Sequence, residues 1–120
     1  MPDAMSGKRV PSRELFDLVA GHFRVLGEPA RLELLHTLAD GERSAASLLA
    51  ETKISQANLS KHMTVLCQAG FVTRRREGPY VHYLLADARV LSLCELMCDR
   101  LESDAISAQE LIAARMLHEG

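Results

Sequence analysis

The sequence predicts a mainly α-helical domain that contains one small β-hairpin. Leucine recurs at helical spacing in several segments, which are separated by Gly, Pro, Ser and Asp. One stretch, residues 71–85, instead alternates around a Gly-Pro turn, as two paired strands do. The chain has 120 residues, of which 48% are hydrophobic and 25% charged, so it is long enough for one folded domain and too short for two.

The N-terminal part divides into an arm and a first helix. Residues 1–10 show no periodicity, and we expect a flexible arm there. Pro11 can be the first residue of a helix, because the N–H that proline lacks would have no hydrogen-bond partner at that position. Apolar side chains then recur at helical spacing from Leu15 to Leu26. We expect residues 11–120 to form the folded domain.

Three more helices are predicted before the hairpin. Glu28-Pro29 starts the second, which Asp40-Gly41 ends. Ser44 is a suitable N-cap for a short third helix, and Ser55 for a fourth that ends near Gly70. The stripe expected to be buried on the fourth helix consists of Leu59, Met63 and Leu66.

The pattern then changes to strands and back to a helix. Residues 71–76 form the first predicted strand, Glu77-Gly78-Pro79 the turn, and Tyr80–Leu85 the return strand. Asp87 caps a last long helix that runs to about Leu117. The predicted order is ααααββα. A short helix, a tight turn, a polar-faced helix and a basic hairpin form the winged helix-turn-helix arrangement.

The distribution of charge favours a nucleic-acid partner, although the net charge is −2. No Asp or Glu occurs from Thr52 to Arg76, whereas seven acidic and three basic residues follow from Asp87 onward. A basic block on one side of an acidic protein is typical of a phosphate-binding face. The basic residues of this block are Lys53, Lys61, Arg74, Arg75 and Arg76.

The fourth helix carries the side chains that major-groove recognition requires. Gln or Asn near a helix N-terminus can bond bidentately to adenine, and the positive end of the helix dipole favours phosphate. When this helix is considered without the hairpin, its polar side could instead be a solvent-exposed face that binds no DNA. The residues that we expect to contact DNA on this helix are Ser55, Gln56, Asn58, Leu59, Lys61 and His62.

The hairpin supplies the second half of the predicted DNA interface. Three consecutive arginines lead into its turn, where they can reach a phosphate backbone or a minor groove. By strand alternation, Arg74 and Arg76 share one face and Arg75 lies on the other. The expected DNA contacts of the hairpin are Arg74, Arg75, Arg76 and Tyr80.

The segment Phe23–Leu32 resembles the opening signature of the ArsR/SmtB family of winged-helix repressors. The similarity covers about residues 12–100, and its most specific block is Ser-Gln-x-x-Leu-Ser-x-His at Ser55–His62. The resemblance implies a homodimer built from the first and last helices, which binds an inverted-repeat DNA operator and represses transcription. The symmetry of such a dimer predicts half-sites about one helical turn apart.

Two inducer sites known in that family have no counterpart here. The arsenic site is a Cys-x-Cys motif, and the matching region Ser44–Ile54 contains neither Cys nor His. The zinc site begins with an Asp-x-His pair, which Asp87-Ala88-Arg89 replaces, and no His occurs between Cys94 and Asp104. The resemblance therefore leaves the inducer, and whether one exists, open.

The three cysteines leave three alternatives. Cys94 and Cys98 are one helical turn apart, and with Cys67 they could bind a soft metal or metalloid ion such as As(III) or Cd(II). The same thiols could sense oxidants or sulfur species. They could equally be packing residues, since Leu91, Cys94, Cys98 and Leu101 form an apolar seam with 3-4-3 spacing. No other cofactor is expected.

Other classes of protein are less consistent with the sequence. It has no Gly-rich phosphate loop, no His-Glu-x-x-His motif and no nucleophile in a recognisable setting, so we expect no enzyme. No apolar run is long enough for a membrane span, no signal pattern opens the chain, and an odd number of cysteines fits a reduced cytoplasmic protein. The alternative function is a winged-helix protein-interaction module without specific DNA binding.

Overall fold

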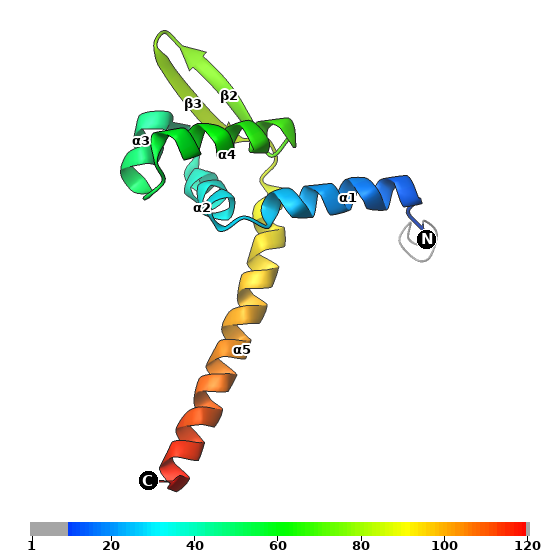
Figure 1. Cartoon of the computed structure of the whole chain (residues 1–120), viewed down its shortest axis with the longest axis vertical. Coiled ribbons are helices and arrows are strands. Elements are labelled where there is room, and N and C mark those ends of the chain that lie inside the picture. The colour runs from blue at the N-terminus through cyan, green and yellow to red at the C-terminus, as the bar shows by residue number, and fades with distance from the viewer. Residues whose placement is uncertain (1–9, 120) are drawn as a thin grey trace. The chain divides into compact units, whose positions relative to one another are not determined.

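The structure of the chain is a computed structural model that describes residues 10–119, so most of the predicted N-terminal arm lies outside the described residues (Figure 1). These residues form two compact units that divide between Ala86 and Asp87. The first unit holds four α-helices and a three-stranded sheet, and the second is one long helix. The mainly α-helical class with a small hairpin is confirmed.

Helix α1 (Arg13–Leu26) begins two residues later than Pro11. Ser12 has the extended backbone of an N-cap, and its hydroxyl accepts a hydrogen bond of 3.1 Å from the backbone N–H of Leu15. The prediction that Pro11 is the first helical residue is therefore wrong. The serine that follows it can satisfy a free N–H of the first turn, which proline cannot do.

Helix α2 (Pro29–Thr37) begins with Pro29, as predicted, and continues as a 3₁₀ turn, η1 (Leu38–Asp40). Gly41 ends this segment with a φ of 133°, a backbone conformation that disfavours any residue with a Cβ. The next two residues, Arg43–Ser44, form a short strand, β1, that the sequence did not predict. Ser44 is also the N-cap of α3 (Ala45–Glu51), as predicted, and accepts from the N–H of Ser47.

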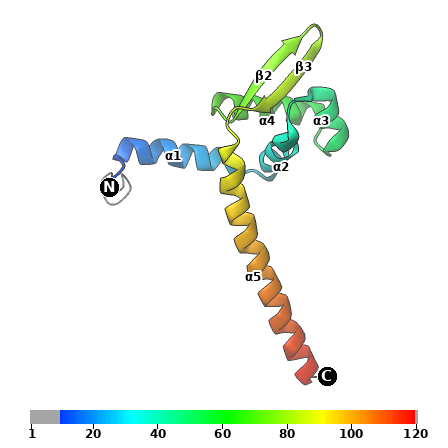
Figure 2. The same cartoon turned by 180° about the vertical axis from the view of Figure 1, so that it is seen from behind.

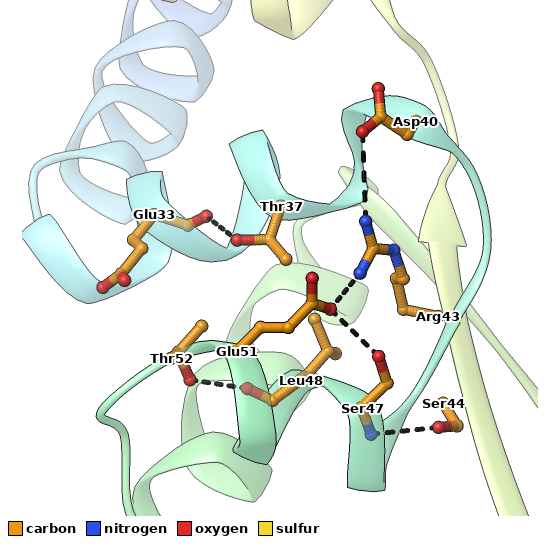
Figure 3. Close-up of polar contacts among 9 residues, drawn as sticks. All are labelled: Glu33, Thr37, Asp40, Arg43, Ser44, Ser47, Leu48, Glu51 and Thr52. Carbon is orange, nitrogen blue, oxygen red and sulfur yellow. Dashed lines mark hydrogen bonds and ion pairs between the residues drawn. The ribbon is translucent and has the colours of Figure 1, made fainter.

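Polar contacts hold β1, η1 and α3 together (Figure 3). The guanidinium of Arg43 is paired with Glu51 near the end of α3 and lies 3.9 Å from the carboxylate of Asp40. The buried hydroxyl of Thr52 donates to the carbonyl of Leu48 at 2.7 Å, which closes the last turn of α3 before the chain enters the next helix. The Arg43 contacts thus tie β1 and η1 to α3, and the Thr52 contact fixes the start of the turn that leads to the next helix.

Helix α4 (Gln56–Gln68) begins at the predicted N-cap, since the hydroxyl of Ser55 accepts a hydrogen bond of 3.2 Å from the N–H of Asn58. The predicted stripe on this helix is fully buried. It packs into a core supplied by α2, η1, α3 and the sheet. The core side chains of this unit include Leu34, Leu35, Leu38, Leu48, Leu59, Met63, Leu66, Val72 and Tyr83.

Strands β2 (Val72–Glu77) and β3 (Tyr80–Leu85) form the predicted hairpin, and both views show it beside α4 (Figures 1 and 2). The sheet order is β1-β3-β2, and all pairs are antiparallel. Glu77 still pairs with Tyr80, so the turn contains only Gly78 and Pro79 instead of three residues. Gly78 has a φ of 60°, the left-handed conformation that such tight hairpin turns require.

Helix α1 is attached to the end of α4 by one histidine. The Nε2 atom of His22 is 3.0 Å from the carbonyl oxygen of Ala69, and its ring packs edge-on against Phe71 with centroids 5.4 Å apart. Ala69 is the C-cap of α4. The contact therefore ties α1 to the C-terminal end of the helix that carries the predicted DNA contacts.

The second unit is helix α5 (Arg89–Glu119), which runs without interruption. Asp87 lies at its start as predicted: the carboxylate accepts a hydrogen bond of 2.9 Å from the N–H of Arg89. Hydrogen bonds from the side chain and the backbone of Arg89 lower the pKa of Asp87 to about 2. Within residues 10–119, no helix has the length and apolar character that crossing a membrane requires.

Candidate nucleic-acid interface

The exposed side of α4 lies opposite its buried stripe. Successive residues of a helix are rotated by about 100°, so Lys61 points away from Leu59, Met63 and Leu66. The side chains of Ser55, Gln56, Asn58 and Lys61 are exposed, as major-groove contacts must be. We call Gln56, Asn58, Ser60, Lys61 and Thr64 the polar face of α4.

The first turn of α4 is suited to anionic DNA. It contains no acidic residue, so no carboxylate opposes the positive end of the helix dipole. The hydroxyl oxygen of Ser55 accepts the capping bond from Asn58, and its proton can still be donated to a phosphate. Ser55 is therefore both the N-cap of α4 and a predicted DNA contact.

The prediction of a DNA contact is wrong for Leu59. Only 3% of this residue is exposed, because it belongs to the buried stripe of α4. Its contribution is to hold the helix on the core, and the polar residues on the opposite side remain available for DNA.

His62 lies at the border between the polar face and α2. It is half-buried, and its Nδ1 is 3.3 Å from the guanidinium Nη1 of Arg31. Arg31 in turn donates from Nε to the carbonyl oxygen of Val25 at 2.6 Å. Because a guanidinium can only donate, this contact makes Nδ1 the acceptor and leaves the ring proton on Nε2. His62 can then offer one donor to a phosphate oxygen or a guanine edge.

Two exposed residues of the polar face were missed from sequence. Ser60 and Thr64 follow Gln56 at intervals of four, so the three side chains form a row on the side of α4 nearest the hairpin. Their helical spacing was a usable signal. They were overlooked because short hydroxyl side chains on a helix do not stand out unless the neighbouring hairpin is placed beside them.

The row borders a groove of about 350 Å³ between α3, α4 and the hairpin. Apolar side chains form its floor, including Leu49, Met63 and Tyr83. Arg74 from β2 lies at its wall. The groove thus joins the polar face of α4 to one face of the hairpin.

The register of the hairpin separates the three arginines as predicted. Arg74 pairs with Tyr83 and Arg76 with Val81, whereas Arg75 pairs with His82 on the opposite face. Tyr83 is buried, so the face of Arg74 and Arg76 is the one directed toward α4. The guanidinium of Arg75 instead binds the carboxylate of Glu42, which no sequence signal singled out. Tyr80 is 64% exposed beside the turn.

The cysteines occupy different environments. Cys67 lines the groove, half-buried, and its burial raises the pKa of the thiol despite the opposing charge of Arg74. On α5, burial and the neighbouring Cys98 raise the pKa of Cys94, while Cys98 itself is exposed. Among the residues described, no group of three His, Cys, Asp or Glu side chains could hold a metal ion. Metal binding or redox sensing by these thiols stays a prediction.

A Ser-capped helix with a polar outer face, preceded by a short helix and a turn and followed by a basic hairpin, defines a winged helix-turn-helix DNA-binding protein. Residues 28–74 match the model of the bacterial regulatory protein, arsR family. The chain is also 33% identical over 107 residues to an uncharacterized HTH-type transcriptional regulator of Mycobacterium tuberculosis, covering 86% of this chain and 94% of the relative. It belongs to the ArsR family of transcriptional regulators.

Further relatives agree with this assignment. The chain is 39% identical over 80 residues to the probable mercury resistance operon repressor of Streptomyces lividans, a match that covers 67% of this chain and 64% of that repressor. A solved homodimeric winged helix-turn-helix DNA-binding domain from Mycobacterium bovis has a TM-score of 0.69 at 31% identity, covering 82% of this chain and 95% of that one. The predicted family, fold and class of function are confirmed, and the members of this class are regulators of transcription, not enzymes.

Proposed function

We propose that the protein is a homodimeric repressor that binds an inverted-repeat operator through α4 and the hairpin. The observation that carries this proposal is the polar face of α4, which is exposed and free of acidic side chains beside a basic strand. A protein that binds chromosomal DNA works where that DNA is, so the proposal keeps the cytoplasmic location predicted from sequence.

Each part of the interface has a distinct task in this proposal. Gln56 and Asn58, in the first turn of α4, have amides suited to bidentate bonds with adenine. Lys61, Arg74 and Arg76 neutralise phosphates, which gives affinity without sequence preference. Tyr80, which lies beside the hairpin turn, contacts the DNA backbone. Specificity therefore comes from the first turn of α4, and most of the salt dependence from the basic side chains.

The homodimer is supported by apolar surface that a single chain leaves in water. Helix α1 exposes an apolar face to solvent, and so does helix α5. The relative from Mycobacterium bovis is titled homodimeric, and a second copy of this chain is the occupant that we propose. The exposed apolar residues of α1 are Leu15, Phe16, Leu18, Val19 and Phe23. On α5, one side of the helix exposes Leu93, Leu96, Met97, Leu101, Leu111 and Ile112, while Ile106 is exposed on another side.

A titration of labelled DNA from upstream of its own gene tests the proposal, with a scrambled duplex of equal length as control. We expect two protomers to bind the upstream DNA tightly. The affinity should fall steeply as salt rises, because the formation of several phosphate contacts releases counterions. Equal and weak binding to both duplexes would favour the alternative, a protein-interaction module.

Release by a thiol-directed signal is a second proposal, and it concerns Cys94 and Cys98. The two thiols lie one turn apart on α5, a spacing that suits two ligands of one soft ion, and Cys98 is exposed in the single chain. As(III), Cd(II), Hg(II), peroxide and persulfide are added in turn to the complex with DNA. Release that is lost in Cys98→Ser supports a sensor, whereas binding indifferent to all five agents makes these cysteines packing residues.

A further inference from the structure

The outer face of the hairpin carries a set of charged side chains that links its two strands to the residue before β1. Arg75 on β2 donates from Nε to Oε1 of Glu42 at 3.3 Å and from Nη2 to Oε2 at 2.5 Å. His82, the β3 partner of Arg75, has its ring nitrogens 3.6 Å from the carboxylates of Glu42 and Glu77. Glu42 immediately precedes β1. We call Glu42, Arg75, Glu77 and His82 the brace.

The brace connects parts of the chain that are far apart in sequence. Glu42 and Arg75 are separated by 33 positions, and their contact is bidentate, which fixes the orientation of both groups. The Arg75 guanidinium lowers the pKa of Glu42, so the carboxylate remains ionised at neutral pH. The hairpin is thereby tied to the segment that follows Gly41, whose φ of 133° disfavours residues with a Cβ.

Arg75 points away from the face that meets DNA in the proposed function. Its neighbours Arg74 and Arg76 share the face of the buried Tyr83, which is directed toward α4. A guanidinium already bound by two carboxylates has less to gain from a phosphate. Three consecutive arginines therefore have two separate tasks.

We propose that Glu42 and Arg75 are positioning residues of the DNA interface: they hold the hairpin at the angle at which Arg74 and Arg76 meet the DNA backbone. This inference rests on the proposed function, and it removes Arg75 from the DNA contacts that the sequence predicted. Glu42, an acidic residue, becomes a residue that DNA binding needs.

The effect of Glu42→Gln on operator affinity distinguishes the brace from a phosphate contact by Arg75. The brace predicts weaker binding, whereas a phosphate contact predicts tighter binding. We expect Glu42→Gln and Arg75→Gln each to weaken operator binding by about 2- to 5-fold, as loss of a surface ion pair allows. The double variant should be no weaker than either single one. The salt dependence of binding should stay unchanged, because no phosphate contact is lost. If Glu42→Gln tightened binding while Arg75→Gln lowered the salt slope by about 0.9, Arg75 would be a phosphate contact and the proposal would be overturned.

Exchanging the two charges gives a rescue test that a phosphate contact cannot pass. Glu42→Arg with Arg75→Glu restores the pair with opposite polarity, and both are made in a Glu77→Gln background to remove the like charge beside position 75. We expect the exchanged pair to bind DNA within about 2-fold of Glu77→Gln alone, and Arg75→Glu alone to bind much more weakly. Failure of the exchange to restore binding, in a variant that keeps its melting temperature, rejects the brace.

Two controls keep this test independent of the proposed function. Arg76→Gln should lower the salt slope by about 0.9, since Arg76 is assigned to a phosphate; an unchanged slope counts against the phosphate contact of the proposed function, whereas the brace as a link within the protein is tested without DNA. Amide hydrogen exchange without DNA tests the brace alone. Glu42→Gln and Arg75→Gln should both speed exchange in β2 and β3 while α4 keeps its protection, and unaltered exchange would overturn the proposal.

Discussion

Helices α4 and α5 both carry an apolar stripe, yet only the stripe of α4 is buried. Leu59, Met63 and Leu66 on α4 lie in the core of their own unit, with exposures of 3% or less. On α5, Leu101 is 59% exposed and Ile112 56%. The same kind of pattern thus stabilises the fold of one chain in α4 and offers an association surface in α5. Only the surroundings of the stripe, and not its sequence, distinguish the two cases.

The largest effect is expected where the stripe of α5 receives a charge. Leu101→Asp places a carboxylate in the middle of the face that a second copy would cover, and an unpaired buried charge costs about 3–5 kcal/mol. Sedimentation equilibrium should show monomers, and operator binding should fall accordingly. Ile106→Asp is the matched control, because Ile106 is similarly exposed but lies on another side of the helix. Equal effects of the two substitutions would show that the seam is not the dimer interface.

The next effect concerns the stripe of α4. Leu66 is fully buried, so Leu66→Ala removes core contacts and leaves a cavity, which should lower the free energy of unfolding by about 2–5 kcal/mol. Urea unfolding measures the change. Ile106→Ala on α5 should shift the same free energy by no more than about 0.5 kcal/mol. If both substitutions destabilised the protein equally, the contrast between the helices would be lost.

The exposed side of α4 gives a smaller and more selective effect. Asn58→Ala should weaken binding to the upstream DNA by about 1–3 kcal/mol and relax the preference at one base pair of each half-site. Thermal unfolding should hardly change, because the side chain of Asn58 is exposed. A uniform loss across all base substitutions would instead assign Asn58 to the DNA backbone.

The smallest effect lies at the start of α5 and depends on pH. The pKa of Asp87 is lowered to about 2, so its bond to Arg89 stabilises the helix start fully above the ordinary carboxyl range near 4. That contribution is lost as pH falls through about 2. Carbon NMR of the carboxyl group should show the titration, and Arg89→Ala should move it upward toward 3.8, the usual value.

Local features were predictable from sequence and non-local ones were not. The caps at Ser44 and Ser55 depend on neighbouring residues only, and the spacing of the apolar stripe on α4 is contained in its own segment. Strand β1 has two residues and exists only because β3 lies beside it, so no pattern in its own sequence could indicate it. For the same reason the partner of Arg75 was missed, since Glu42 is 33 positions away.

The errors within the DNA interface have different origins. Helical spacing, with about 100° of rotation per residue, already assigns Leu59 to the buried stripe and so excludes it from the outer face. Arg75 differs from Arg74 and Arg76 only by strand alternation, which was predicted. What it binds on its own face depends on the tertiary structure. The residues alone favoured DNA as the partner without establishing it, and the family resemblance strengthened that expectation.

Ser44 ends strand β1 and also caps helix α3. One residue therefore belongs at once to the sheet that carries the hairpin and to the helix pair that carries α4. Its backbone faces His82 of β3, while its hydroxyl holds the N–H of Ser47. The hinge between the sheet and the helix pair is therefore as short as a chain allows, because the last residue of β1 is already the N-cap of α3.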